Sequence, residues 1–222
     1  ARCLRNLCYK LRRFHYKYVH YDSPDERGVD VALLYDSTRL SILNSRALSL
    51  SLDGDATRDI LYVSALYEQR DTVHVMMCHL PSQLGGASNT DWKRQRAKSL
   101  IQSQIDSIFL FQPSANIVVM GDMNTSAQDD LTGMVNLMIP IQKMGQGTHK
   151  YQGIWTCLDQ FYVSQSIATK ATTTIFSPWW LLEEDTKYLD YKPHRTYIGF
   201  RYNDGYSDHL PIVLHLRLDN KE

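Results

Sequence analysis

The sequence lacks an excess of either charge. Its 222 residues include 24 lysines and arginines and 24 aspartates and glutamates, so the formal net charge is zero. Proteins that bind long duplex nucleic acid without sequence preference usually carry a basic excess, so the composition counts against that class but leaves a local basic patch open. No run of about 18 apolar residues occurs, and we expect no membrane-spanning helix. The basic N-terminal segment also lacks the apolar core of a signal peptide.

Cysteine is scarce as well. The four cysteines are Cys3, Cys8, Cys78 and Cys157, and no two of them have CxxC or metal-ligand spacing. A chain of this length has enough core to need no disulfide framework, so we expect free or buried thiols. Hydrophobic residues make up 43% and charged residues 22%, which is typical of a globular protein. We expect residues 1–222 to form a single domain.

Apolar patterns along the chain predict many strands and few helices. A short amphipathic helix is expected between Leu4 and Leu11, where leucines recur at helical spacing. A long helix is expected from about Asp91 to Phe109, with Thr90 as its N-cap. Further elements are expected as strands at 16–21, 29–35, 40–50, 60–67, 73–79, 116–120 and 210–218, a helix at 130–138, and a hairpin at 151–163 hinged near Gln152 and Gly153. This mixture predicts an α/β sandwich.

The segment Met120-Gly121-Asp122-Met123-Asn124 follows a short, fully apolar strand. If the chain stays extended there, Asp122 and Asn124 project to the same side. A carboxylate and an amide oxygen side by side suit Mg²⁺. Taken alone, however, a turn that closes the strand is the better interpretation of these two residues.

A second segment places Asp208 beside His209, just before an apolar strand. The pair offers one metal ligand and one group that titrates near neutral pH. Because adjacent residues on a strand diverge, the two side chains need a bend or separate tasks. A loop leading into an edge strand is the alternative, and Pro211 is compatible with a strand start.

Two further polar residues adjoin apolar strands. His79 lies where a strand opens into a loop, the usual place for catalytic side chains, although a single histidine there is more often structural. Asp159 is the only charged residue in the largely apolar run Trp155–Val163. A buried carboxylate requires a partner such as a protonated histidine or a metal ion, and a structural ion pair would also satisfy it.

Jointly and in order, the segments HLPS, GDMN, LDQ and SDHLP resemble the endonuclease/exonuclease/phosphatase superfamily. This superfamily includes pancreatic deoxyribonuclease, apurinic-site endonucleases, neutral sphingomyelinases and inositol polyphosphate 5-phosphatases. The resemblance runs from about Tyr16 to Leu216, and the segments Gly28–Tyr35 and Thr57–Leu61 also look like the family's strands. It implies a deoxyribonuclease I-like, four-layered αββα sandwich (α/β, or α+β) that hydrolyses phosphoester bonds with a divalent metal.

The resemblance also implies a metal site. Asp208 matches a metal-ligating aspartate, and Asp122 and Asn124 match the pair that holds a second metal or the attacking water and contacts the phosphate. The implied ion is Mg²⁺, with Mn²⁺ as an alternative. A divalent ion can neutralise phosphoryl charge and activate water together.

Three more residues are implied to meet the substrate, and a fourth is implied to orient one of them. His209 matches a histidine that serves as a base or as a cation beside the phosphate, and Asp159 matches the aspartate that orients it. His79 matches a second position that faces the phosphate. Arg58 matches, on a shorter motif, an arginine that contacts substrate phosphate.

The chain departs from the family pattern at its start. Family members begin with a strand that ends in asparagine, followed by a strand carrying a metal-binding glutamate, and neither motif is found before Tyr16. We therefore expect a domain without its first strands, with weaker metal binding because one carboxylate is gone. Uncovered sheet edges would favour self-association. A strict, well-folded monomer in size-exclusion chromatography would count against that last expectation.

The long aromatic segment at residues 177–206 is expected to be irregular and close to the catalytic face. A loop of this length is usually functional or disordered. Trp179 and Trp180 could stack on a base or sugar, or could anchor the loop by packing. Three basic side chains there could meet phosphates, namely His194, Arg195 and Arg201. The acidic run Glu183–Asp185 is expected to be solvated.

Three functions stay open. The first is a metal-dependent nuclease or phosphodiesterase whose substrate includes nucleic acid among its candidates. The second is a phosphomonoesterase on a small phosphorylated sugar or lipid head group, which the neutral charge mildly favours over long duplexes. The third is a binding module that has lost activity with the metal-binding glutamate. Cellular compartment does not follow from these residues.

Overall fold

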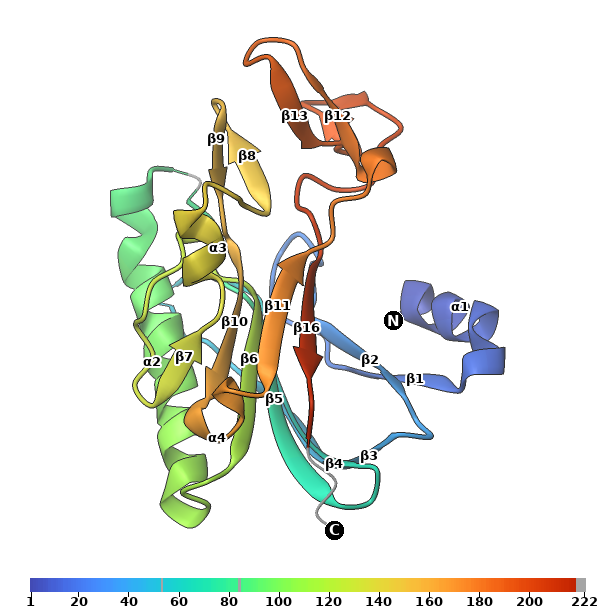
Figure 1. Cartoon of the computed structure of the whole chain (residues 1–222), viewed down its shortest axis with the longest axis vertical. Coiled ribbons are helices and arrows are strands. Elements are labelled where there is room, and N and C mark those ends of the chain that lie inside the picture. The colour runs from blue at the N-terminus through green and yellow to red at the C-terminus, as the bar shows by residue number, and fades with distance from the viewer. Residues whose placement is uncertain (53, 84, 219–222) are drawn as a thin grey trace.

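A computed structural model describes residues 1–52, 54–83 and 85–218 (Figure 1). Its centre is a six-stranded sheet of order β3-β4-β5-β6-β10-β7. These strands are β3 (Leu40–Leu48), β4 (Ile60–Tyr67), β5 (Asp71–His79), β6 (Asn116–Asp122), β10 (Asp159–Ser164) and β7 (Met134–Asn136). Among the described strands of this sheet, only β5 and β6 pair in parallel. Helix α2 (Ala87–Phe111) connects them, because parallel neighbours need a crossover.

The central sheet is buried on both faces, which explains why its strands are apolar along most of their length. Successive residues of a strand point to opposite faces. On one face, Ile60, Ile117 and Val119 form a cluster with Ile101 and Ile105 of α2. Helix α2 covers this face in Figure 1.

The opposite face packs against two antiparallel strand pairs. One pair is β1 (Tyr16–His20) with β2 (Ala32–Asp36), and the other is β11 (Ala171–Ile175) with β16 (Ile212–Leu216). The side chains between these pairs and the central sheet form two apolar clusters, whose members include Leu33, Val63, Val118 and Leu214. The site described below lies at one end of this second interface.

Helix α1 (Arg2–Lys10) lies outside the β1–β2 pair (Figure 1), and none of its residues is buried. It is followed by the 3-10 turn η1 (Arg12–Phe14). The order α2, central sheet, strand pairs, α1 confirms the predicted αββα sandwich. Within the part of the chain that the structure describes, no helix combines the length and apolarity needed to cross a bilayer.

The helix predicted at residues 130–138 is wrong. This stretch contains the edge strand β7, and the short helix α3 (Ile139–Lys143) follows it. Gly133 has a φ of 78°, which interrupts a helix. The Asn136 side chain donates hydrogen bonds to the Gln128 carbonyl and to Gln160 Oε1. These tertiary bonds override the local apolar pattern. The predicted long helix is confirmed, but it begins after Gly86 rather than Thr90.

The hairpin predicted near Gln152 and Gly153 is confirmed as β8 (His149–Tyr151) and β9 (Ile154–Thr156). Both turn residues have positive φ, 49° and 81°, as a two-residue hairpin turn requires. The remainder of the predicted hairpin is the separate strand β10, which joins the central sheet and runs into helix α4 (Gln165–Ala168).

The segment predicted as irregular holds two hairpins and the 3-10 turn η2 (Trp179–Leu181). The first hairpin is β12 (Leu182–Asp185) with β13 (Asp190–Pro193), and the second is β14 (Tyr197–Ile198) with β15 (Arg201–Tyr202). The β12–β13 hairpin lies beside β8–β9 at one end of the molecule (Figure 1). Strands of two to four residues are too short for periodicity to reveal them.

Candidate active site

Three strand ends carry polar side chains in one row. His79 of β5 pairs with Asp122 of β6, and Asp122 pairs with Asp159 of β10. Paired residues lie on the same face of a sheet, about 4.7–4.9 Å apart from strand to strand. Asp122 and Asp159 continue the rows of Val118 and Phe161, which face the second strand layer. The polar row therefore begins where the apolar interior of the sandwich ends.

His209 reaches this row from the second strand layer. Its Nδ1 lies 2.7 Å from Asp159 Oδ2. Its backbone forms an isolated bridge with His149 of β8, and the amide of Leu210 donates to the Thr148 carbonyl at 2.8 Å. The residues before β16 are not in a regular strand, which supplies the bend that Asp208 and His209 need to share one site.

A close approach between β5 and β6 explains the glycine before Asp122. Gly121 has a φ of 128°. A Cβ atom at this position would lie 2.0 Å from the Cys78 carbonyl oxygen. Any side chain would push the strands apart, and Asp122 would move away from His79.

Asp122 and Asn124 meet through a turn. The chain does not stay extended here, because β6 ends at Asp122 and Asn124 has a φ of 50°, so the turn that closes the strand is the interpretation that holds. The Asn124 amide donates to Asp122 Oδ1 at 2.8 Å, and its Nδ2 donates to Asp122 Oδ2 and to the Leu80 carbonyl. The turn folds Asn124 back against Asp122, and both side chains line the same pocket.

Burial shifts the titration of Asp122 and His79 toward their neutral forms. Burial, and then the negative charge of Asp159, raise the pKa of Asp122 to about 6. Burial, and then the positive charges of Arg58 and Arg27, lower the pKa of His79 to about 4. Nε2 of His79 lies 3.5 Å from Asp122 Oδ2. At neutral pH His79 is therefore an uncharged hydrogen-bonding group.

His209 shifts in the opposite direction. Burial alone would lower the pKa of its imidazole, but the hydrogen bond and charge of Asp159, with the charges of Asp122 and Asp208, raise it to about 9. In the metal-free protein, this side chain is thus a cation held among carboxylates. Because Nδ1 is bound to Asp159, Nε2 is the ring nitrogen left for another partner.

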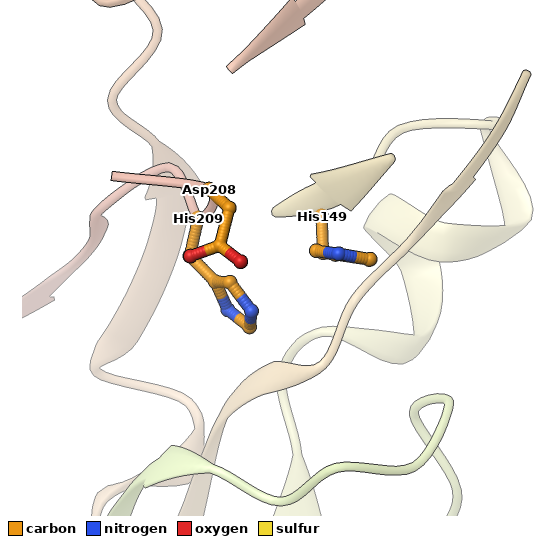
Figure 2. A group of neighbouring side chains, drawn as sticks. All are labelled: His149, Asp208 and His209. Carbon is orange, nitrogen blue, oxygen red and sulfur yellow. The ribbon is translucent and has the colours of Figure 1, made fainter. Parts of the chain in front are cut away.

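His149 is a candidate that sequence reasoning missed. Figure 2 shows its side chain, carried by β8, beside those of Asp208 and His209. The two imidazole ring centres are 4.9 Å apart, and ligand atoms of the three residues lie within 4.8 Å of one another. The three residues of β8 are too few to form a pattern that could have revealed His149.

Six of the seven residues that the resemblance assigns to the metal and phosphate site line one pocket, with a cavity volume of about 990 Å³. They are His79, Asp122, Asn124, Asp159, Asp208 and His209. His149 and Tyr151 line it as well. The structure thus brings these side chains together, whereas their chemical roles stay predictions.

Two groups of atoms in the pocket could hold a divalent cation. Asp122 and Asn124 offer adjacent oxygens, which suit Mg²⁺. Asp208 groups instead with the imidazoles of His149 and His209, a mixed carboxylate and imidazole set that suits a transition-metal ion. The raised pKa of Asp122 reflects burial beside a second carboxylate, a condition that a bound cation would relieve. The residues present therefore fit a divalent ion.

Arg58 does not face this pocket as predicted. Its guanidinium is buried and donates to Asp25 Oδ2 and to the carbonyls of His79 and Leu80. These bonds occupy all three guanidinium nitrogens. Arg58 therefore stabilises the loop that follows β5, because its guanidinium binds the carbonyls of His79 and Leu80. It does not present a free cation to the pocket.

Some of the predicted aromatic and basic residues of 177–206 are held by contacts within the segment, and others are exposed. Trp180 packs edge-on against Phe176 and Tyr206, which anchors the segment, whereas Trp179 is exposed. His194 bonds to the Asn203 carbonyl. The expectation of a solvated acidic run is wrong for Asp185, which is buried near Lys150.

The family model described as "Endonuclease/Exonuclease/phosphatase family" matches residues 5–218. Among solved structures, truncated TDP2 of Caenorhabditis elegans is similar with a TM-score of 0.62 and 15% identity, over 93% of this chain and 76% of that chain. The human Nocturnin catalytic domain gives 0.60 and 15%, over 95% and 76%. A family protein from Bacteroides thetaiotaomicron gives 0.62 and 13%, over 96% and 78%. No curated protein matches the sequence.

The stabilising role of Arg58 can be tested by its loss. The side chains of Arg58 and Asp25 are each only 3% exposed, so Arg58→Met leaves a buried carboxylate without its buried partner. We expect the free energy of unfolding to fall by about 3–5 kcal/mol, measured by urea denaturation. Arg27 binds the same carboxylate from the surface, so Arg27→Met is the control and should cost less than about 1 kcal/mol. Equal losses would contradict the assigned role.

Proposed function

We propose that this chain, which belongs to the endonuclease/exonuclease/phosphatase family, is a divalent-metal-dependent phosphodiesterase. The observation that carries the proposal is the single pocket in which His79, Asp122 and Asp159, from three strands, meet His209, from the segment before β16. Hydrolysis of a phosphodiester joins a water oxygen to phosphorus, breaks one ester P–O bond, and delivers a proton to the departing oxygen. The pocket offers a group for each of these needs.

His209 is the proposed proton-transferring or charge-stabilising group. Its Nδ1 is fixed by Asp159 at 2.7 Å, so the ring orientation is set before substrate binds. The Nε2 atom would face a phosphate oxygen or the attacking water. Asp159 acts through His209, and we assign it a positioning role.

Asp122 and Asn124 are proposed to hold the attacking water against the phosphorus. Their mutual hydrogen bonds fix both side chains, which reduces the reorganisation needed during the reaction. His79, next to Asp122 and uncharged at neutral pH, would donate a hydrogen bond to a phosphate oxygen. Arg58 holds the backbone of this histidine, so we replace its predicted substrate contact with a positioning role.

A divalent ion, Mg²⁺ or Mn²⁺, would supply charge neutralisation and water activation when bound. We propose Asp208 as a ligand of this ion, and Asp122 with Asn124 as the residues that hold the attacking water or a second ion. Asp208 is exposed and lies 3.8 Å from Arg195 at the pocket rim, so its carboxylate is accessible to a cation from solvent.

A phosphomonoesterase is the second candidate function. The neutral overall charge favours small substrates, but the pocket volume of about 990 Å³ is at the upper end of the range of small-molecule sites. It leaves room for organic groups beyond a single phosphate. The structure of Danio rerio TDP2 complexed with a single-strand DNA product supports nucleic acid as one diester to test.

Replacing His209 with glutamine tests the proposed chemistry. On bis(p-nitrophenyl) phosphate we expect His209→Gln to lower kcat by about 10²–10⁴-fold, since a positioned proton-transfer group contributes that much. His215→Gln is the control, because this histidine is exposed on β16. A kcat that is unchanged in His209→Gln, or that falls equally in His215→Gln, would contradict the proposal.

Metal removal and substrate choice test the reaction class. EDTA should abolish hydrolysis, Mg²⁺ or Mn²⁺ should restore it, and Asp208→Asn should raise the metal concentration needed for half-maximal rate about tenfold or more. The diester bis(p-nitrophenyl) phosphate should be cleaved with a higher kcat/KM than the monoester p-nitrophenyl phosphate. A preference for the monoester would favour the second candidate, and inactivity on both would favour a binding module.

A further inference from the structure

The β8–β9 hairpin forms one wall of the proposed phosphate pocket without belonging to the central sheet. His149 and Tyr151 of β8, with Thr156 and Leu158 at the end of the hairpin, line the pocket. The row of His79, Asp122 and Asp159 comes instead from the central sheet. The pocket therefore has a polar sheet side and a wall that presents an aromatic and an aliphatic side chain.

The Tyr151 side chain is exposed enough to contact a ligand in the pocket. Its side chain is 68% exposed although it lines a concave site. It follows His149 by two residues, so both point to the same side of β8, and His149 lies against His209. A group attached to a phosphate at His209 would thus pass His149 and reach the side of β8 that carries Tyr151. Aromatic faces bind flat rings by stacking.

A buried lysine fixes this wall. The Lys150 side chain is only 1% exposed, and its Nζ donates to Asp190 Oδ2 at 2.7 Å and to the Tyr191 carbonyl at 2.9 Å. It also lies 3.7 Å from Asp185 and over the ring of Trp155. These contacts tie β8 to the β12–β13 hairpin.

Two further contacts restrain the hairpin. At its tip, a Cβ atom on Gly153 would lie 2.7 Å from the Tyr188 ring, so the turn packs closely on β12–β13. At its base, the Leu210 amide binds the Thr148 carbonyl. The wall is held at both ends, which lowers the entropic cost of binding a ligand there.

We propose that β8 forms a subsite for a flat aromatic ring esterified to the phosphate, with Tyr151 as the stacking residue and Lys150 as the residue that positions the wall. The inference rests on the proposed function, because the subsite is defined by its place beside the phosphate pocket. It narrows the substrate class to phosphate esters that carry such a ring.

Two non-hydrolysable phosphonates test the subsite without requiring turnover. Phenylphosphonate and methylphosphonate carry the same charged group and differ in the ring. By calorimetry in the presence of Mg²⁺, we expect the wild-type protein to bind phenylphosphonate at least about fivefold more tightly, as one stacked ring contributes. Tyr151→Ala should reduce the ratio to less than about twofold through the phenyl ligand alone, and Tyr151→Phe should retain it. Tyr197→Ala, at an exposed tyrosine of β14, is the matched control.

Lys150→Met tests the positioning role, with Lys192→Met on β13 as its control, because Lys192 contacts Glu183 on the same hairpin. We expect Lys150→Met to lower the phenyl-to-methyl ratio in a protein whose circular dichroism matches the wild type. If this variant does not fold, Asp190→Asn, which removes a surface partner of Lys150, should lower the ratio in its place.

Equal binding of the two phosphonates, absence of binding, or a ratio unchanged in Tyr151→Ala would overturn the subsite. Loss of the ratio in Tyr197→Ala would do the same. A clear ring preference in a protein that hydrolyses no phosphate ester would leave the subsite standing and remove the proposed function, so the two failures are distinguishable.

Discussion

The in-register pairing of β5, β6 and β10 is the constraint on which the site depends. It places His79, Asp122 and Asp159 side by side, and it is achieved only because Gly121 lets β5 and β6 approach closely. A one-residue slip in any of these pairings would turn a polar side chain to the other face of the sheet. The apolar packing on both faces prevents such a slip, since it would also bury the wrong side chains.

Charged groups around the pocket are placed in pairs, and the pairing explains how they tolerate burial. Asp159 binds His209, Arg58 binds Asp25, and Lys150 binds Asp190. Taking an unpaired charge out of water is costly, whereas a hydrogen-bonded pair offsets most of that cost. The three pairs hold a catalytic candidate, the loop after β5, and the β8–β9 wall. In this fold, hydrogen-bonded pairs of opposite charge therefore fix the parts of the site relative to one another.

Much of the fold and part of the site could be predicted from the sequence. The strands of the central sheet other than β7 followed from runs that are apolar along most of their length, and the convergence of Asp122 with His209 followed from short motifs. The helix predicted at 130–138 does not form, because the positive φ of Gly133 and the side-chain hydrogen bonds of Asn136 outweigh the local apolar periodicity. Arg58 had the residue type of a phosphate ligand, and only the position of Asp25 showed that its donors were occupied. His149 was missed because β8 has three residues, too few for a pattern.

The central claim is that the His79–Asp122–Asp159 row, with Asp208 and His209, surrounds one phosphate and its cation. A crystal structure of the protein soaked with Mn²⁺ and inorganic phosphate tests it directly, since Mn²⁺ is located by its anomalous scattering. The account predicts one phosphate within hydrogen-bonding distance of both His79 and His209, and Mn²⁺ bound to Asp208 or Asp122. Phosphate and Mn²⁺ bound only outside this pocket, or a pocket that stays empty at saturating concentrations of both, would contradict it.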